Sequence, residues 1–318
     1  MTQVSVVILC KNEERYIGET LQAVLDQGEV PCEVLVIDAG SRDRSVQIVQ
    51  QYPVTLLRIG PHAFGHGRTR NLGARLATGE FVVFLNGDAT PTDKGWLSGL
   101  ISGFTGEGIA GVYSRIYPRP GCNPLDARSI VDDRYLFNGK VKDLRAFPDY
   151  FSLSPEKKRR VSSFHTVSCA IRRGVLLHQP FADIAFGEDL EWSKRMIEAG
   201  LSIVYASDSA VWHSHDTGAS LSTSLQRSFD DARACQKIFR RWSVRRLCGW
   251  AAVSARAVIS DLRYIAGLER SLLYKLRWMV RSPFVRAAQY LGILLGCAPF
   301  LPRRAAEALS LVARRKKG

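Results

Sequence analysis

The first 90 residues alternate between short apolar runs and amphipathic segments, and no other feature of this sequence restricts its fold as strongly. Strand-like and helix-like segments follow one another at residues 4–10, 13–27, 33–38, 43–52, 54–59, 67–77 and 81–85. Such alternation is typical of parallel strands joined by helical crossovers. We therefore predict an α/β fold with a doubly wound, mostly parallel sheet that binds ligands beyond the carboxyl ends of its strands.

The length and composition of the chain leave room for a second, smaller region. The chain has 318 residues, of which 46% are hydrophobic and 23% are charged. These values are typical of globular proteins and exclude a disordered tail or a collagen-like repeat. We expect a first domain at residues 1–220 and a helical, basic region at residues 221–318.

The seven cysteines are odd in number, are scattered along the chain and form no CxxC pair. This pattern indicates neither a disulfide framework nor a structural zinc site, and it fits a reducing cytoplasm. The apolar run at residues 4–10 is too short for a signal peptide, so we expect it to form the first buried strand.

The positive charge is concentrated in the C-terminal region. Residues 221–318 contain 20 lysines and arginines and five acidic residues, whereas residues 1–220 contain 24 basic and 25 acidic residues. A neutral body with a basic extension predicts docking onto an anionic partner, such as a membrane surface, a lipid-linked phosphate or a nucleic acid.

The basic region also has a helical hydrophobic pattern. Four arginines recur every seven residues and would form a single basic line on one continuous helix: Arg256, Arg263, Arg270 and Arg277. Residues 287–301 carry no charge, but they are fewer than the ~20 residues that span a bilayer. We expect them to form an interfacial or re-entrant segment that holds the chain at the inner face of the cell membrane. The alternative is a helical bundle that packs on the first domain, with its arginines merely solvated.

The middle of the chain, at residues 114–161, is rich in Pro, Gly, Asp and Arg and has weak periodicity. We expect long loops here, of the kind that carry substrate contacts over the edge of a sheet.

Polar side chains follow two of the predicted strands. Asp38 ends the run at residues 33–38, where a carboxylate can accept hydrogen bonds from a nucleobase or a ribose hydroxyl. The alternative is that Asp38 only forms the turn that follows. Asn86 and Asp88 follow the run at residues 81–85, and their oxygens suit Mg²⁺ or Mn²⁺ bridging a diphosphate. Asn or Asp at such a junction can also arise by chance.

Further candidates lie beyond the middle region. Glu188 and Asp189 begin a predicted helix, whose N-terminus favours the ionised carboxylate that a general base requires. Helix capping alone is the alternative. His213 follows a strand-like run and could donate a ring nitrogen to the same cation, or it could be a hydrogen-bonded turn histidine.

The order of these motifs resembles that of the inverting glycosyltransferases of family 2. The matching stretches lie within residues 3–216 and read SVVILCKNEERYIGETLQAVLDQ, EVLVIDAGSRDRS, GHGRTRNLGARLATGEFVVFLNGDATP, FGEDLEWSKRMIEAGLSIVY and VWHSH. The resemblance implies a GT-A fold, a nucleotide-diphosphate-sugar donor and a divalent cation, Mg²⁺ or Mn²⁺.

The resemblance also implies roles for single residues. Asp38 matches the acid that contacts the nucleobase, and Asp88 matches the metal-binding acid of the DxD-type motif. Asp189, next to Glu188, matches the base of the ED motif, and His213 matches a histidine that ligates the metal. Asn86 replaces the first acid of the DxD-type motif, so we expect a more loosely held cation.

Two arginines in the stretch GHGRTRN, Arg68 and Arg70, are candidates for contacts with the donor. A solvated helix face is the alternative for both.

Three stretches narrow the expected activity. FGHGRTRNLGA and FLNGDATP are most similar to members described as rhamnosyltransferases, which suggests a dTDP-rhamnose donor. KIFRRW, at residues 237–242, has Ile238 where processive synthases have Gln, so we expect transfer of one sugar per event. The expected acceptor is a hydroxyl of a glycan or a lipid-linked molecule in cell-surface polysaccharide synthesis.

Three other function classes are open at this point. A sugar-nucleotide nucleotidyltransferase would need a Gly- and Arg-rich loop after the first strand, but residues 10–16 read CKNEERY. A nucleic-acid-binding protein would explain the basic tail, but the tail is rich in apolar residues and Trp, so we expect no nucleic acid as a partner. A non-catalytic scaffold would explain Asn86.

Overall fold

The computed structural model describes residues 4–132, 140–214, 220–239, 247–298 and 301–310. It divides into two compact units. The sheet unit consists of Met1–Tyr117 and Arg134–His213, and the helical unit consists of Pro118–Asp133 and Ser214–Gly318. The boundary expected at residue 220 lies near the second division, and residues 118–133, which the sequence placed in the first domain, belong to the helical unit.

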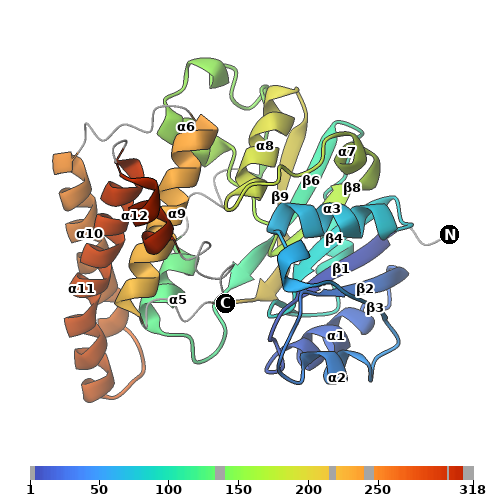
Figure 1. The fold of residues 1–318 in the computed structure, drawn as a ribbon, viewed down its shortest axis with the longest axis horizontal. Helices are drawn as coiled ribbons and strands as arrows, with labels where there is room; N and C mark the ends of the chain where they lie inside the picture. Colours follow the sequence, from blue (N-terminus) through green and yellow to red (C-terminus); the bar gives the residue numbers. More distant parts are fainter. Residues whose placement is uncertain (1–3, 133–139, 215–219, 240–246, 299–300, 311–318) are drawn as a thin grey trace. The chain divides into compact units, whose positions relative to one another are not determined.

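A mixed sheet forms the centre of the sheet unit (Figure 1). Within the described residues it has nine strands, which are β1 (Val4–Cys10), β2 (Cys32–Asp38), β3 (Thr55–Arg58), β4 (Phe81–Asn86), β5 (Thr90–Pro91), β6 (Ile109–Tyr117), β7 (Val141–Lys142), β8 (Ser168–Arg172) and β9 (Ser202–Trp212). The order is β3-β2-β1-β4-β8-β6-β9-β5, and β7 pairs with β9. The first four strands in this order are parallel, as the alternating pattern predicts, and β8 runs antiparallel to β4 and β6.

Helices cover both faces of the sheet because each crossover carries one apolar side. The helices of this unit are α1 (Ile17–Leu25), α2 (Ser45–Val49), α3 (His66–Leu76), α4 (Trp96–Ile101), α6 (Pro155–Val161), α7 (Arg173–His178) and α8 (Glu188–Glu198). One core cluster packs side chains of β1 and β4 against Ala74 of α3, Leu176 of α7 and Trp192 of α8. Figure 1 shows α1 and α2 on the opposite side of strands β1 to β3 from α3.

The expectation of long loops at residues 114–161 is wrong in part. This region contains the end of β6, helix α5 (Pro124–Val131), strand β7, the 3₁₀ turn η2 (Tyr150–Ser152) and α6. Both helices begin at an Asn-Pro or Ser-Pro pair, in which the first residue caps the helix and proline occupies its first turn. These two local signals were present in a segment whose weak periodicity hid them.

The helical unit is built from α5, α9 (Leu221–Phe239), α10 (Leu247–Ala266), α11 (Leu272–Cys297) and α12 (Arg303–Leu309). The charge-free segment does not form a separate re-entrant element, because residues 287–297 continue α11. Gly292 and Gly296 lie against the backbone of α9, and a Cβ atom at Gly292 would come within 2.2 Å of the Leu225 carbonyl oxygen. Two glycines four residues apart thus allow the close approach of two helices. This part of the segment therefore packs on α9, while its expected position at a membrane interface stays a prediction.

The four arginines spaced by seven residues do not share one helix. Arg256 and Arg263 belong to α10, which ends at Ala266, while Arg277 belongs to α11. The single basic line expected from the sequence is therefore wrong, since a turn separates the two helices. In the part of the chain that has been described, no helix combines the length and apolar character needed to cross a membrane.

A buried carboxylate ties three helices of this unit together. Asp261 of α10 has no exposed surface, and its Oδ2 atom accepts hydrogen bonds from Arg286 Nε at 2.8 Å and from Ser282 Oγ at 2.5 Å. Its Oδ1 atom pairs with Arg286 Nη2 at 2.7 Å and with Arg128 of α5. Burial raises the pKa of Asp261, but the bonds and charge of Arg286, with Ser282 and Arg128, outweigh burial and lower it overall.

Six cysteines have described side chains, and all six are free: Cys10, Cys32, Cys122, Cys169, Cys235 and Cys297. Among these six the structure contains no disulfide, as the sequence pattern predicts. The side chain of Cys248 lies outside the described part.

Replacing Asp261 with Asn should destabilise the helical unit by about 3–5 kcal/mol, because the buried guanidinium of Arg286 loses its counter-charge and Arg128 loses one of two. Denaturant unfolding followed by circular dichroism, with hydrogen exchange to locate the loss in α10 and α11, measures this. Asp132→Asn is the matched control, since Asp132 pairs with the same Arg128 but is half exposed, and it should change stability by less than ~0.5 kcal/mol. Equal effects of the two substitutions would contradict the assignment.

Candidate active site

The carboxyl ends of β1, β2 and β4 meet at one edge of the sheet. The strand register pairs Cys10 with Asp38 and Leu9 with Asn86, so all three strands end at the same level. The loops that follow these strands carry several of the residues singled out in the sequence. Ligand binding beyond the carboxyl ends of parallel strands is the usual arrangement in such sheets.

Asp38 is buried at the end of β2 and orders the turn that follows it. Its Oδ2 atom accepts hydrogen bonds from the backbone N–H groups of Gly40 and Ser41, both at 3.1 Å, and its Oδ1 atom accepts one from the Ser41 hydroxyl. Gly40 adopts a φ of +80°, which favours glycine at this position. The observed bonds correspond to the turn-forming alternative, so contact of Asp38 with a nucleobase stays a prediction. Burial, and secondly the Asp38 charge, raise the pKa of the neighbouring Cys10 to about 12.

The loop after β1 is joined to the loop after β2, which the sequence did not indicate. Asn12 has a φ of +56°, and its side chain accepts a hydrogen bond from Arg42 N at 2.8 Å. Its own N–H donates to Ser41 Oγ at 2.9 Å, and Glu14 accepts from Arg44 N at 3.1 Å. Asn tolerates the left-handed conformation better than most residues, and this was the only local signal in the stretch KNEE.

Arg70 connects two of the candidate motifs. Only 3% of this residue is exposed, and its Nη1 atom donates to Glu188 Oε1 at 2.7 Å. Its Nη2 atom donates to Asn86 Oδ1 at 3.3 Å and lies 3.5 Å from the Thr166 carbonyl oxygen. Helix α3 thus supplies one guanidinium that holds the end of β4 next to the start of α8. Arg70 contacts protein groups here, so its predicted contact with a donor is untested.

Asp189 lies in the first turn of α8, directly after Gly187 and Glu188. Gly187 has a φ of +79°, a conformation that lets the chain enter the helix at this point. Asp189 is largely buried, and its carboxylate accepts hydrogen bonds from Leu190 N at 2.8 Å and from Thr166 N at 3.4 Å.

Burial and, secondly, the charge of Glu188 raise the pKa of Asp189 to about 7, although Arg70 and the two backbone bonds act in the opposite direction. The sequence predicts that the helix N-terminus keeps this acid ionised, but burial and the neighbouring charge act against ionisation here. Desolvation and a like charge outweigh the helix dipole at this position. A carboxyl group with a pKa near 7 is well suited to exchange protons at neutral pH.

Asp88 and His213 form a pair at the same edge of the sheet. His213 directly follows β9 and is buried, and its Nδ1 atom lies 3.2 Å from Asp88 Oδ1. The backbone N–H of His213 donates to the Tyr117 carbonyl at 2.9 Å, which fixes the residue beside β6. The Asp88 carboxylate is the oxygen ligand that suits Mg²⁺ or Mn²⁺, and the imidazole beside it could add one nitrogen ligand. In the described residues no group of three or more His, Cys, Asp or Glu side chains could hold a metal, so other ligands would have to complete the shell.

Arg68 and the segment His165–Thr166 are the remaining residues to consider near the candidate site. Arg68 is exposed, and its Nη2 atom donates to the carbonyl of Phe64 at 3.1 Å, which leaves further N–H groups of the same guanidinium for other contacts. His165 and Thr166 were not singled out in the sequence, although Thr166 contacts both Arg70 and Asp189. His165 anchors this segment through Nε2 to the Ser114 carbonyl at 3.0 Å, and burial lowers its pKa to about 3. Only the three-dimensional structure brings this short segment next to α3 and α8.

Comparison with known proteins decides the family. The sequence profile described as glycosyl transferase family 2 matches residues 5–178, more than half of the chain. The chain belongs to glycosyl transferase family 2. The match makes it a glycosyltransferase, so the nucleotidyltransferase, nucleic-acid-binding and scaffold alternatives are wrong as descriptions of its main activity.

Relatives with assigned names are similar over most of their length. This family 2 enzyme is 29% identical over 284 residues to the O-antigen chain rhamnosyltransferase WbaN of Salmonella anatum, which covers 88% of this chain and 84% of that one. It is 26% identical over 307 residues to the O-antigen chain rhamnosyltransferase RfbN of Salmonella typhimurium, which covers 92% of this chain and 89% of the relative.

Solved structures show the same fold. The mannosyltransferase PcManGT of Pyrobaculum calidifontis, crystallised with GDP-Man and Mn²⁺, superposes with a TM-score of 0.57 at 17% identity and covers 90% of this chain and 85% of that one. Residues 1–349 of TarS of Staphylococcus aureus superpose with a TM-score of 0.52 at 15% identity, with 93% and 90% covered. The predicted GT-A fold is confirmed.

Two substitutions of Arg70 should distinguish the effect of its charge on activity from the effect of its hydrogen-bond geometry. Arg70→Lys keeps the charge but cannot reach both Glu188 and Asn86, so kcat should fall roughly 10- to 100-fold with a smaller change in KM. Arg70→Met also removes the charge that lowers the pKa of Asp189, so the acid limb of the pH profile should move to higher pH.

Arg75→Met, an exposed arginine of the same helix, is the control for both substitutions and should leave kcat and the pH profile unchanged. If Arg70→Met lowers activity without moving the acid limb, Arg70 does not act on Asp189.

The raised pKa of Asp189 predicts the pH dependence of sugar transfer. If Asp189 is the general base, kcat/KM should follow its ionised form: half-maximal near pH 7, constant well above that pH and falling about tenfold per unit below it. Glu188→Gln removes the like charge that raises the pKa of Asp189, so the limb should move to lower pH whatever the remaining activity. The profile is measured from initial rates, and a limb that stays in place in Glu188→Gln would contradict this account.

Proposed function

We propose that this glycosyltransferase transfers one sugar per event, with inversion of configuration, from a nucleotide-diphosphate sugar to a hydroxyl of a glycan or lipid-linked acceptor in cell-surface polysaccharide synthesis. The donor that we expect is dTDP-rhamnose. This donor and pathway are supported by the two O-antigen chain rhamnosyltransferases that are similar over more than four fifths of both chains. The expectation of single transfer rests partly on the stretch KIFRRW. Residues 240–242 of this stretch lie outside the described residues.

The proposal depends on one observation above all. The Asp88–His213 pair and the largely buried Asp189 belong to one compact unit. Within this unit, the Arg70 side chain donates hydrogen bonds to both Asn86 and Glu188. Asn86 lies two residues before Asp88, and Glu188 directly precedes Asp189. An inverting transfer needs these two functions together, one at the departing diphosphate and one at the attacking hydroxyl.

The proposed reaction is a single displacement at the anomeric carbon. Asp189 accepts the proton of the acceptor hydroxyl while that oxygen forms the new bond to the anomeric carbon. The bond between this carbon and the diphosphate oxygen breaks on the opposite face, and its electron pair leaves with the nucleoside diphosphate. Bound Mg²⁺ or Mn²⁺ would offset the negative charge that develops on the diphosphate.

The remaining residues bind and position. Asp88 and His213 would hold the cation, and Asn86 would add a neutral oxygen that Arg70 already shares. The loops after β1 and β2, with Asp38 between them, would hold the nucleobase, and Arg68 is the exposed cation expected to contact the donor. We further propose that the protein works on the cytoplasmic side, at the inner face of the cell membrane, where a lipid-linked acceptor would be found.

Measurements of donor binding and of turnover distinguish the proposed role of Asp88 in binding from that of Asp189 in proton transfer. With dTDP-rhamnose and MnCl₂ the folded protein should gain thermal stability, because a ligand that binds only the native state raises the unfolding midpoint. Asp88→Asn should lose the part of this gain that depends on Mn²⁺. Asp189→Asn should keep donor affinity within a few-fold and lose transfer by roughly 100- to 10,000-fold.

Asp26→Asn is the control, since Asp26 is exposed at the end of α1, where its side chain accepts a hydrogen bond from Gln22 Nε2 at 2.9 Å. It should behave as the wild type in both assays. Normal turnover in Asp189→Asn would remove this residue from the role of base. A stabilisation by another sugar nucleotide, but none by dTDP-rhamnose, would overturn the proposed donor.

A further inference from the structure

Helix α11 of the helical unit presents a continuous apolar stripe to solvent. Leu273 is 81% exposed, Val280 65% and Phe284 60%, which is unusual for side chains of this type. The members of the stripe are Leu272, Leu273, Leu276, Val280, Phe284 and Leu291. Their spacing places them within one third of the helix circumference, along about 28 Å at ~1.5 Å per residue. We call this surface the α11 stripe.

The stripe is distinct from the sides of α11 that hold the helical unit together. Trp278 and Val285 pack with Leu125 and Ile265 in a small core cluster. Arg286 and Ser282 bind the buried Asp261, and the two glycines near the end of the helix lie against α9. The other sides of α11 therefore make all the contacts described here that hold the helical unit together. Exposed apolar side chains that do not contribute to the fold indicate a surface that binds a partner.

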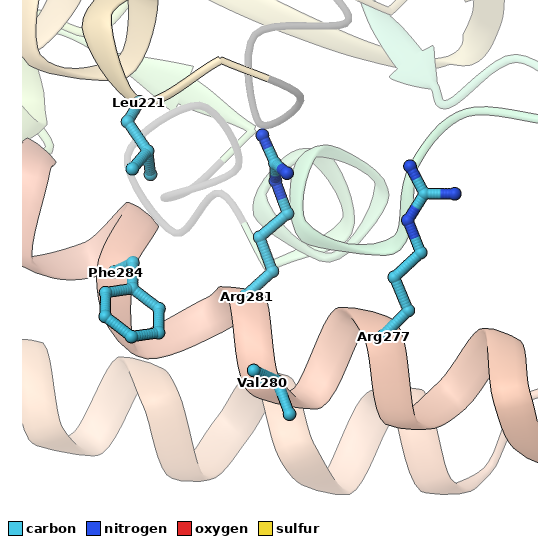
Figure 2. Close-up of a pocket in the computed structure, with 5 residues that line it drawn as sticks. All are labelled: Leu221, Arg277, Val280, Arg281 and Phe284. Atoms are coloured by element: carbon cyan, nitrogen blue, oxygen red, sulfur yellow. The ribbon is translucent and has the colours of Figure 1, made fainter.

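Basic side chains border the α11 stripe. Arg277 and Arg281 lie beside it on the helix, and Figure 2 shows both guanidinium groups extending from the same side of α11. Together with Leu221, Val280 and Phe284 they line an open pocket with a volume of about 270 Å³. Helix α11 contains four basic residues and no acidic one. A partner that matches this surface must therefore be apolar in one part and negatively charged in the part next to it.

The interface of an anionic lipid bilayer has this combination. Acyl chains accept exposed Leu, Val and Phe side chains, and lipid phosphates lie at the level where Arg side chains emerge. No helix among the described residues could cross the bilayer, so the fitting geometry is a helix lying in the plane of the membrane surface. A nucleic acid would match the arginines but would leave the stripe exposed to water.

We propose that the α11 stripe is the surface by which this protein lies on an anionic membrane, with Arg277 and Arg281 at the phosphates of the lipid headgroups. The proposal names the contact surface for the membrane localisation given above, and it does not depend on the sugar donor. It also replaces the arginine line expected from the sequence, of which only Arg277 borders the stripe.

Vesicle flotation of the full chain tests the proposal. The wild type should bind vesicles of phosphatidylcholine mixed with phosphatidylglycerol and bind pure phosphatidylcholine much more weakly. Leu273→Gln combined with Val280→Gln should weaken binding by roughly 100-fold, because two large apolar side chains no longer enter the acyl region. Arg277→Gln combined with Arg281→Gln should weaken it by at least roughly tenfold and remove most of the preference for the anionic lipid.

Arg75→Gln combined with Leu76→Gln is the matched control, because it removes an exposed arginine and an exposed leucine from another helix, α3. It should float as the wild type does. Leu273 and Val280 are exposed members of the stripe, and Arg277 and Arg281 border the stripe. Circular dichroism and the thermal stabilisation by donor should therefore stay unchanged in these variants. This second readout separates a failure of the membrane proposal from a failure of the proposed activity.

Equal flotation of the Leu273/Val280 variant and the wild type would overturn the proposal. So would equal binding of the wild type to neutral and anionic vesicles. If the same substitutions convert a dimer to a monomer in sedimentation and leave flotation unchanged, the stripe is an interface between copies of the chain and the proposal is wrong.

Discussion

The buried ion pair between Arg70 and Glu188 is the contact on which the arrangement of the candidate site depends. It joins α3 to α8 across 118 residues of sequence, and the same guanidinium reaches Asn86 at the end of β4. In the interior such charges stabilise one another only while all partners are present. One side chain therefore determines both how closely the Asn86–Asp88 loop and α8 approach each other and how strongly a positive charge acts on Asp189.

The two units use buried charge in different ways. In the helical unit two guanidinium groups face one carboxylate, so Asp261 is held ionised and its pKa is lowered. In the sheet unit two adjacent carboxylates share one guanidinium, and the second of them, Asp189, has its pKa raised towards neutrality. An excess of counter-charge gives a permanently ionised structural group, whereas a shortage gives a group that exchanges protons under ordinary conditions.

The sequence predicts well those features that neighbouring residues determine. The strands and helices of the first 90 residues follow from local periodicity, and the GT-A fold follows from motif order. The errors are of two kinds: local capping signals that weak periodicity hid, as at α5 and α6, and contacts between distant segments. The raised pKa of Asp189 depends on burial by other elements. The break between α10 and α11 has a local signal in Ser271, whose side chain accepts a hydrogen bond from Tyr274 N and caps α11, but the seven-residue spacing of the arginines hid it. Thr166 was missed because nothing in its own neighbourhood marks it.

The buried cysteines of the central sheet have a practical consequence. Cys10 ends β1 beside the turn of Asp38, and Cys169 lies in β8 next to β4, on either side of the strand that carries the Asn86 motif. Burial raises the pKa of both thiols, so thiolate-seeking reagents find almost no reactive form in the native state. Alkylation at either position would report openings of the strands themselves, so these two natural cysteines can serve as probes of how rigid the sheet is next to the candidate site.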